Sequence, residues 1–338
     1  MTQKILVTGG TGYIGSHTAV KLLEAGYEVV ILDNLCNSKF QVLDRITSIT
    51  GKSPEFVLGD IRDKEILTKI FSGNDFFAVL HFAGLKAVGE SETEPDKYYE
   101  NNVVGSTNLI EQMIIAEVHN FIFSSSATVY GDPGFPRYDE NTAICPVNVY
   151  GRTKQDVEEF IRLTAERYET FKFGILRYFN PIGAHQSGMI GEDPNGVPNN
   201  LLPFVSQVAV GKRDKVQIWG NDYKTSDGTG KRDYIHVEDL ASGHLAALET
   251  LVKTKTSLTV NLGTGNSSSV LEVISAFEKA SGREIPYTFE SRRKGDLDEY
   301  YADVTLAKEL MGWSTKYDLD RMCVDAWRWQ SLNPNGYL

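Results

Sequence analysis

The sequence predicts an α/β protein with a doubly wound parallel sheet and a second, smaller mixed α/β lobe. Three observations lead to this fold class. Short apolar runs alternate with stretches of helix length, a glycine-rich turn follows the first run, and an aspartate ends the second. The chain has 338 residues, which suits one large domain or two smaller ones.

The apolar runs of the first half are expected to be buried strands, because strands covered on both faces are apolar throughout. A later run, Leu258–Asn261, is able to return to the same sheet. The earlier runs are Lys4–Thr8, Glu28–Leu32, Glu55–Leu58, Phe76–His81, Asn120–Ser124 and Phe173–Arg177.

Helices are expected between these strands and again near the C-terminus. The first three cover residues 13–25, which Gly26 ends, 101–117 and 151–168. Ser269 and Glu272 form a capping box that opens another helix, and Gly282 ends it. Residues 180–236 are rich in Gly, Pro and Asn and lack periodicity, which indicates a ligand-binding lobe. We therefore expect a nucleotide domain at 1–179, with a returning segment near 237–263, and a substrate domain at 180–236 and 264–338.

Composition excludes several classes of protein. The chain is 41% hydrophobic and 23% charged, as in an average globular protein, and contains no apolar run of membrane-spanning length. Its net charge of −11 disfavours binding to nucleic acid or to an anionic membrane. Cys36, Cys145 and Cys323 are too widely spaced for a disulfide framework or a zinc site. With no export signal, the cytoplasm is the expected compartment.

The turn after the first strand has the features of a dinucleotide site of the Rossmann type. Gly9, Gly12 and Gly15 permit a tight turn, close approach of backbone N–H groups to a pyrophosphate, and close packing of helix on strand. Asp33 follows Gly15 by 18 residues and ends the second strand. A carboxylate there accepts a ribose 2′-hydroxyl and repels a 2′-phosphate, so NAD is favoured over NADP. Glycines alone would equally mark a simple loop.

A second motif indicates proton transfer coupled to hydride transfer. Tyr150 and Lys154 lie four residues apart at the start of an expected helix, so their side chains share one face. A phenol is a poor base at neutral pH, but a nearby ammonium or a nicotinamide cation stabilises its phenolate. Ser126 follows the strand Asn120–Ser124 and is placed to bond the same substrate oxygen. Without the nucleotide motif, this spacing would be an ordinary helix pair.

These residues resemble those of the extended short-chain dehydrogenase/reductase family, and within it the UDP-hexose 4-epimerases. The resemblance covers nearly the whole chain, although the glycine turn alone is common to the superfamily. The matching segments are 7–17, 33–38, 81–91, 124–131, 176–181, 198–201, 228–237 and 292–296.

The resemblance implies a tightly held NAD and a UDP-sugar, with Tyr150 as base, Lys154 as its partner and Ser126 on the sugar 4-hydroxyl. It places at NAD the residues Gly9, Gly12, Tyr13, Ile14, Gly15, Asp33, Asn34, Leu35, Cys36, Asn37, Ser38, Asp60, Ile61, Phe82, Ala83, Gly84, Leu85, Lys86, Asn101, Ser126, Tyr150, Lys154 and Phe179. It places at the UDP-sugar the residues Lys86, Ser126, Tyr150, Asn180, Asn200, Leu201, Gln217, Trp219, Arg232, Tyr234, Arg293, Asp296 and Tyr300.

The activity so implied is reversible inversion at sugar C4, between UDP-glucose and UDP-galactose, through a transient 4-keto sugar. Arg232 and Arg293 would bind the diphosphate, and a bulky Tyr300 would crowd an N-acetyl group at C2. The resemblance also implies a homodimer. The helices 101–117 and 151–168 could pack against their copies in it, although their apolar faces could equally be satisfied within one subunit. Two alternatives remain, a nucleotide-sugar 4,6-dehydratase and a non-catalytic NAD-binding regulator. Ala127 and Thr128 lack the acids that a dehydratase usually carries, and a regulator could dispense with Tyr150 and Lys154.

Overall fold

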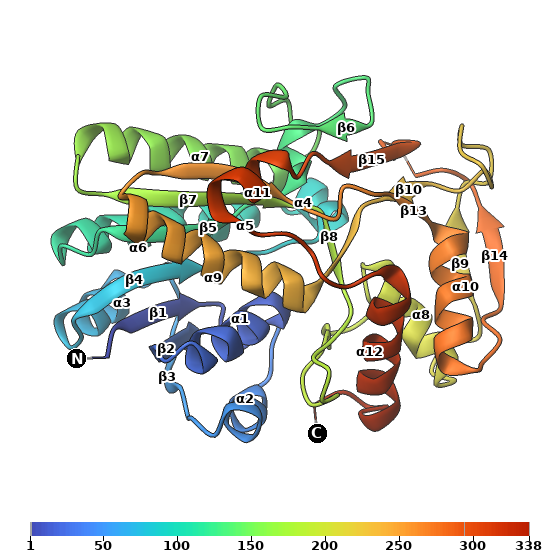
Figure 1. Cartoon of the computed structure of the whole chain (residues 1–338), viewed down its shortest axis with the longest axis horizontal. Helices are drawn as coiled ribbons and strands as arrows, with labels where there is room; N and C mark the ends of the chain where they lie inside the picture. Colours follow the sequence, from blue (N-terminus) through green and yellow to red (C-terminus); the bar gives the residue numbers. More distant parts are fainter. Residues whose placement is uncertain (1, 294, 338) are drawn as a thin grey trace.

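A computed structural model describes residues 2–293 and 295–337 and contains a seven-stranded sheet with every neighbouring pair parallel (Figure 1). Each predicted strand is present, and the strand near residue 258 joins the sheet at one of its two edges. In spatial order the strands are β12 (Leu258–Leu262), β7 (Lys172–Tyr178), β5 (Asn120–Ser124), β4 (Phe76–His81), β1 (Lys4–Thr8), β2 (Glu28–Asp33) and β3 (Glu55–Leu58).

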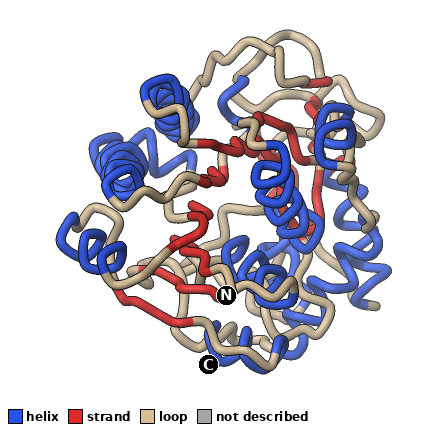
Figure 2. The backbone as a smooth tube through the Cα atoms, turned by 60° about the vertical axis from the view of Figure 1, so that its left-hand side comes forward, coloured by secondary structure: helices blue, strands red, loops and turns tan. Residues whose placement is uncertain are grey.

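Helices cover both faces of this sheet because its strands are apolar on both sides (Figure 2). On β1, Ile5 and Val7 belong to one buried cluster and Leu6, between them, to the other. Helices α1, α2 and α9 contribute to the first cluster, and α3, α6 and α7 to the second. The bounds are α1 (Tyr13–Glu24), α2 (Val42–Thr50), α3 (Lys64–Ser72), α4 (Val88–Thr93), α5 (Pro95–Tyr98), α6 (Gly105–Ile115), α7 (Val149–Arg167) and α9 (Val237–Thr254).

The order of the strands fixes where a ligand can bind. Strand β1 lies between β2 and β4, so the chain leaves β1 toward one side of the sheet and later returns on the other. A crevice opens at such a switch point, at the carboxyl ends of parallel strands. The glycine turn follows β1 at this edge, and the turn that begins at Asp33 follows β2.

The second lobe is assembled from short strands and a helical core. Helices α8, α10 and α12 pack around buried Val205, Phe277 and Met322. The capping box predicted for Ser269 and Glu272 is confirmed at the start of α10. The helices are α8 (Leu201–Ala209), α10 (Val270–Ser281), α11 (Thr305–Met311) and α12 (Leu319–Leu332). The described strands of this lobe form three small sheets. The first contains, in spatial order, β13 (Ser268–Ser269), β10 (Lys231–Arg232), β15 (Glu299–Ala302) and β6 (Arg137–Tyr138). The second pairs β11 (Tyr234–His236) with β8 (Asn180–Ile182), and the third pairs β14 (Tyr287–Glu290) with β9 (Val216–Trp219).

Segments cross the domain boundary expected near residue 180 in both directions. Strand β6 comes from the first 179 residues but pairs with β15 of the second lobe. In the other direction, Ala307 of α11 and Trp313 pack into the core beside α9. Short-range patterning gives no sign of these exchanges, because each depends on partners far away in the sequence.

The helix expected at 101–117 differs at its start. Residues Tyr99–Val104 form a π-helical turn, and α6 then begins at Gly105. Within the turn, Asn101 and Asn102 are buried, and Asn102 bonds both the N–H and the carbonyl of Leu85. This irregular turn thus brings polar side chains to the ligand edge, as π-bulges often do. Within the described residues, no helix has the length and apolar character needed to cross a membrane.

Candidate active site

A cavity of about 650 Å³ lies at the carboxyl edge of the large sheet. Its walls come from the glycine turn, the turns after β2, β3 and β4, the π-helical turn, the start of α7 and the segment 191–200. Among the predicted residues it is lined by Gly9, Gly12, Tyr13, Ile14, Gly15, Asp33, Asn34, Cys36, Asn37, Ser38, Asp60, Ile61, Phe82, Ala83, Gly84, Leu85, Lys86, Asn101, Tyr150, Lys154 and Asn200.

The glycine turn is shaped for close backbone approach. Gly9 has φ +70°, and a Cβ there would lie 2.6 Å from the backbone nitrogen of Ala83. A Cβ on Gly15 would overlap the carbonyl oxygen of Gly9. Helix α1 then starts at Tyr13 with no side chain of the described residues capping it. Its first N–H groups are therefore available to an anion, which fits the pyrophosphate of NAD.

Asp33 is held rigidly at the end of β2. Its carboxylate accepts hydrogen bonds from the N–H of Thr11 (3.1 Å), the N–H of Leu35 (2.9 Å) and the hydroxyl of Ser38 (3.1 Å). These bonds fix the position of the carboxylate at the cavity wall, where its oxygens can accept a hydrogen bond from a ribose hydroxyl. Asp60, predicted to lie at the cofactor, is bound by Arg62, whose hydrogen bonds lower the pKa of the Asp60 carboxyl.

Helix α7 presents the predicted catalytic pair. Its first turn is capped by Asn148, whose side chain accepts the N–H of Gly151, so Tyr150 and Lys154 project from a fixed helix start. Both residues are buried. The ammonium of Lys154 donates to the carbonyl of Ser124 at 2.9 Å and lies 5.9 Å from the centre of the Tyr150 ring.

Burial dominates the proton affinities of this pair. It raises the pKa of Tyr150 well above the usual value of 10.0, although a contact with the Ser126 hydroxyl acts to lower it. It also lowers the pKa of Lys154 to about 8, against the opposing effect of the Glu158 carboxylate. The sequence argument expects the ammonium to lower the pKa of the phenol. In this structure, however, burial has the largest effect on the pKa of Tyr150, and positive charge added to the cavity would favour the phenolate.

Tyr178 is a site residue that the sequence argument missed. It is the last residue of β7 and lines the cavity beside Tyr150, and the hydroxyl of Ser124 donates to its phenol oxygen at 3.1 Å. The sequence contained a signal for Tyr178, which directly follows a predicted strand. Side chains at the carboxyl ends of parallel strands face the ligand crevice. Residues 191–195 and Tyr337 also line the cavity, and no local motif pointed to them.

The other predicted residues do not line this cavity. Ser126 is buried and accepts the Thr128 hydroxyl at 2.9 Å, and Phe179 is buried against Tyr300. Among those predicted for the UDP-sugar, Asn180 bonds the carbonyl of Asp233, whereas Tyr234 is buried in the second lobe. The residues outside the cavity wall are Leu35, Ser126, Phe179, Asn180, Leu201, Gln217, Trp219, Arg232, Tyr234, Arg293, Asp296 and Tyr300.

Several of these residues form a cationic and aromatic cluster in the second lobe. The Arg232 guanidinium stands 4.7 Å from the centre of the Tyr300 ring, and that ring stacks on Tyr138 at 5.8 Å. Arg232 and Arg293 lie 3.8 Å and 2.8 Å from the carboxylate of Asp296. The structure thus brings both predicted phosphate-binding arginines to one carboxylate.

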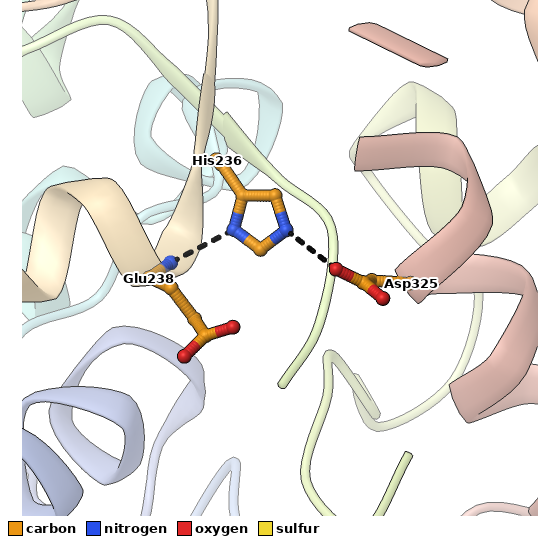
Figure 3. Close-up of side chains that lie close together, drawn as sticks. All are labelled: His236, Glu238 and Asp325. Atoms are coloured by element: carbon orange, nitrogen blue, oxygen red, sulfur yellow. Dashed lines mark hydrogen bonds and ion pairs between the residues drawn. The ribbon is translucent and has the colours of Figure 1, made fainter. Parts of the chain in front are cut away.

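A separate group of potential metal ligands lies between the lobes. His236, Glu238 and Asp325 are buried with ligand atoms within 4.8 Å of one another (Figure 3). The Nδ1 atom of His236 accepts the N–H of Glu238 at 3.0 Å, and Nε2 faces Asp325 at 3.3 Å. Lys21 binds Glu238, and Arg321 binds Asp325. Since both carboxylates are already paired with cations, the geometry favours a charge network joining α1, α9 and α12.

The comparisons with known proteins agree with this geometry. Residues 6–326 match the family model described as GDP-mannose 4,6 dehydratase. The chain therefore belongs to a class of enzymes that have this fold and act on sugar nucleotides. A UDP-glucose 4-epimerase of Yersinia pestis is 55% identical over 98% of this chain and 99% of its own length. The chain belongs to the UDP-glucose 4-epimerases of the extended short-chain dehydrogenase/reductase family.

Solved structures are similar over the whole chain. The UDP-glucose 4-epimerase of Stenotrophomonas maltophila, with bound NAD and formylated UDP-arabinopyranose, is 47% identical with a TM-score of 0.95, covering 98% of this chain and 99% of that one. The enzyme of Bifidobacterium longum, in complex with NAD+ and UDP, is 45% identical with a TM-score of 0.94, covering 99% and 100%.

Proposed function

We propose that this protein interconverts UDP-glucose and UDP-galactose by inverting sugar C4, with NAD as its resident cofactor, in galactose metabolism. The observation that carries the proposal is the Tyr150–Lys154 pair at the wall of a cavity that also contains the glycine turn and Asp33. The names of its relatives support the same activity. The buried pair and the uncapped start of α1 suit a nicotinamide dinucleotide, which supplies a hydride acceptor and donor when bound.

Each catalytic residue has a role that its surroundings support. We assign to Tyr150 the removal of the 4-hydroxyl proton and its later return to the oxygen, with Ser126, whose hydroxyl contacts that of Tyr150, orienting that oxygen. Lys154 adds positive charge, and its bond to Ser124 keeps it beside the phenol. Because burial raises the pKa of Tyr150, the positive charge that NAD⁺ would supply when bound would help to stabilise the phenolate. Oxidation at C4 gives a 4-keto sugar, and reduction of its opposite face inverts the centre without net redox change.

The matched family description makes a 4,6-dehydratase the second candidate. A dehydratase must protonate and expel the C6 hydroxyl after oxidising C4. The two positions after Ser126 carry no acidic side chain. They are Ala127 and Thr128, and the Thr128 hydroxyl donates a hydrogen bond to Ser126. Epimerisation is therefore favoured. Reaction in heavy water separates the two, because a dehydratase incorporates solvent hydrogen into carbon of the sugar and internal hydride return does not.

The direct test uses the purified protein, UDP-galactose and no added cofactor. Formation of UDP-glucose is expected and would show both the reaction and retained NAD. The variant Tyr150→Phe should retain NAD while turnover falls about 10²- to 10⁴-fold, the usual contribution of a positioned acid or base. Turnover that survives nearly intact would remove Tyr150 from its role as base.

We further propose a homodimer formed through α6 and α7. Support comes from exposed apolar side chains on these two helices and at the end of the π-helical turn before α6, namely Ile115, Leu163 and Val104. Sedimentation should give twice the chain mass, and Ile115→Glu should shift the protein to monomer; a wild-type monomer would reject this interface. The free thiols of Cys36 and Cys145 favour a reducing compartment, so we propose a cytoplasmic location.

A further inference from the structure

The segment 191–200, which we name the strap, crosses from one wall of the cofactor cavity to the other. It follows β8 and its turn in the chain and leads into α8. Most of its residues line the cavity, and so do Cys36, Asn37 and Lys39 from the turn after β2. The two walls therefore belong to segments more than 150 positions apart in the sequence.

The tip of the strap is bonded directly to the opposite wall through Asn195. Its backbone N–H donates to the side-chain oxygen of Asn37 at 3.2 Å, and its amide nitrogen donates to the carbonyl of Cys36 at 2.9 Å. The ammonium of Lys39 donates to its amide oxygen at 2.7 Å. Asn195 thus contributes its backbone N–H, its amide nitrogen and its amide oxygen to one contact with the turn after β2.

The rest of the strap is fixed at two further points. The Glu192 carboxylate accepts the ammonium of Lys86 at 2.8 Å, and within the strap it also accepts the amide of Asn200 at 2.7 Å. At its start, the Tyr337 hydroxyl accepts the N–H of Gly191 at 3.0 Å, and the N–H of Tyr337 donates to Asp193 at 2.9 Å. These anchors hold the strap in place near its start, so the exposed contact at Asn195 is the part able to open without unfolding either lobe.

We infer that the strap retains NAD in its cavity, and that the contact between Asn195 and the turn 36–39 must open before the cofactor can leave. The inference rests on the proposed function for the identity of the cofactor. A reaction without net redox change does not need to exchange its NAD between turnovers. A closed strap therefore does not lower the turnover rate. Each exposed hydrogen bond is weak by itself. Three such bonds that must break together form a moderate barrier to the release of NAD, and this barrier is still low enough for NAD to enter.

The test measures release of NAD rather than conversion of sugar. Protein loaded with NAD is desalted and mixed with excess alcohol dehydrogenase and ethanol, which reduce dissociated NAD to NADH at once, so NADH absorbance follows release. Asn195→Ala loses two side-chain bonds and weakens the third, and should release NAD about ten- to a hundredfold faster. Lys39→Ala loses one bond and should accelerate release by about tenfold or less. Lys39→Arg keeps a donor and should stay near the wild-type rate.

Lys64→Ala is the matched control. Lys64 belongs to the same domain and pairs with Glu111 at an exposed position outside the cavity wall, so this variant changes the net charge equally. Release at the wild-type rate from Asn195→Ala would overturn the inference, as would equal acceleration by Lys64→Ala and Lys39→Ala. A wild-type protein that loses its NAD during desalting would overturn it too. Failure to convert UDP-galactose with added NAD would instead reject the proposed function, and the release rates would still decide the role of the strap.

Discussion

The buried ion pair behind the catalytic helix offers the sharpest test of the fold. Glu158 is fully buried on α7, one turn beyond Lys154, and Arg177 on β7 is 2% exposed. Arg177 binds both oxygens of the Glu158 carboxylate, at 3.0 Å and 2.7 Å. The hydroxyl of Ser125 donates to the same carboxylate at 2.6 Å. This carboxylate therefore ties α7 to the turn that carries Ser126.

We predict that Glu158→Gln lowers the free energy of unfolding by about 3–5 kcal/mol, because it leaves a desolvated guanidinium without a counter-charge. The comparison variant is Arg162→Ala. Arg162 pairs with the same carboxylate at 2.9 Å, but its side chain is 37% exposed, so the expected loss is about 0.2–1 kcal/mol. Replacing Glu158 and Arg177 together by methionine should cost less than Glu158→Gln alone, since no buried charge is then left unpaired.

Urea unfolding at constant NAD concentration measures all of these variants. The reasoning fails if Glu158→Gln costs no more than Arg162→Ala, or if the double replacement costs more than the single one. Turnover adds a second readout, because loosening the turn at Ser125 should displace Ser126 relative to Tyr150 and lower kcat more than it raises KM for the sugar nucleotide.

Three further outcomes follow from the structure. Gly15→Ala should yield protein without NAD, because a Cβ there overlaps the carbonyl of Gly9; absorbance of the purified protein checks this. Burial lowers the pKa of His81 from 6.5 to about 3, so below pH 6.5 the unfolded chain binds a proton that the folded one refuses and stability is lost as pH falls. His81→Gln should remove up to about 1.4 kcal/mol per pH unit of that loss. Tyr300→Gly should admit UDP-N-acetylglucosamine, which the wild type should convert poorly; product analysis checks this.

Each of these predictions has a matched control. Gly89→Ala inserts a Cβ where no atom lies within 4 Å, and should leave NAD content unchanged. The half-buried His119 offers a comparison for His81, because His119→Gln makes the same substitution at a position that is not fully buried. Phe135 is 51% exposed at the edge of the aromatic group around Tyr138, and Phe135→Ala should not widen the sugar range. Equal effects from a variant and its control would contradict the corresponding prediction.

The sequence by itself determined the features that depend on neighbours in the chain. Strand and helix order follows from periodicity, the turn at Gly9 from its glycines, and the capping box at Ser269 from spacing along one helix. The Tyr150–Lys154 pair belongs to the same group, because four residues on a helix share a face whatever lies around them. Most of the predicted cofactor residues line the cavity. They follow the carboxyl ends of predicted strands, which local sequence is sufficient to locate.

Only the tertiary structure decided which distant segments meet and how strongly each group is desolvated. The contact of Asn195 with the turn after β2, the pairing of Glu158 with Arg177 and the place of Tyr178 beside Tyr150 leave no local pattern in the chain. The proton affinities of Tyr150 and Lys154 likewise depend on burial that spacing does not reveal. The physical reason is that packing and dielectric environment are set by residues distant in sequence, whereas helix faces, caps and turns are set by residues a few positions apart.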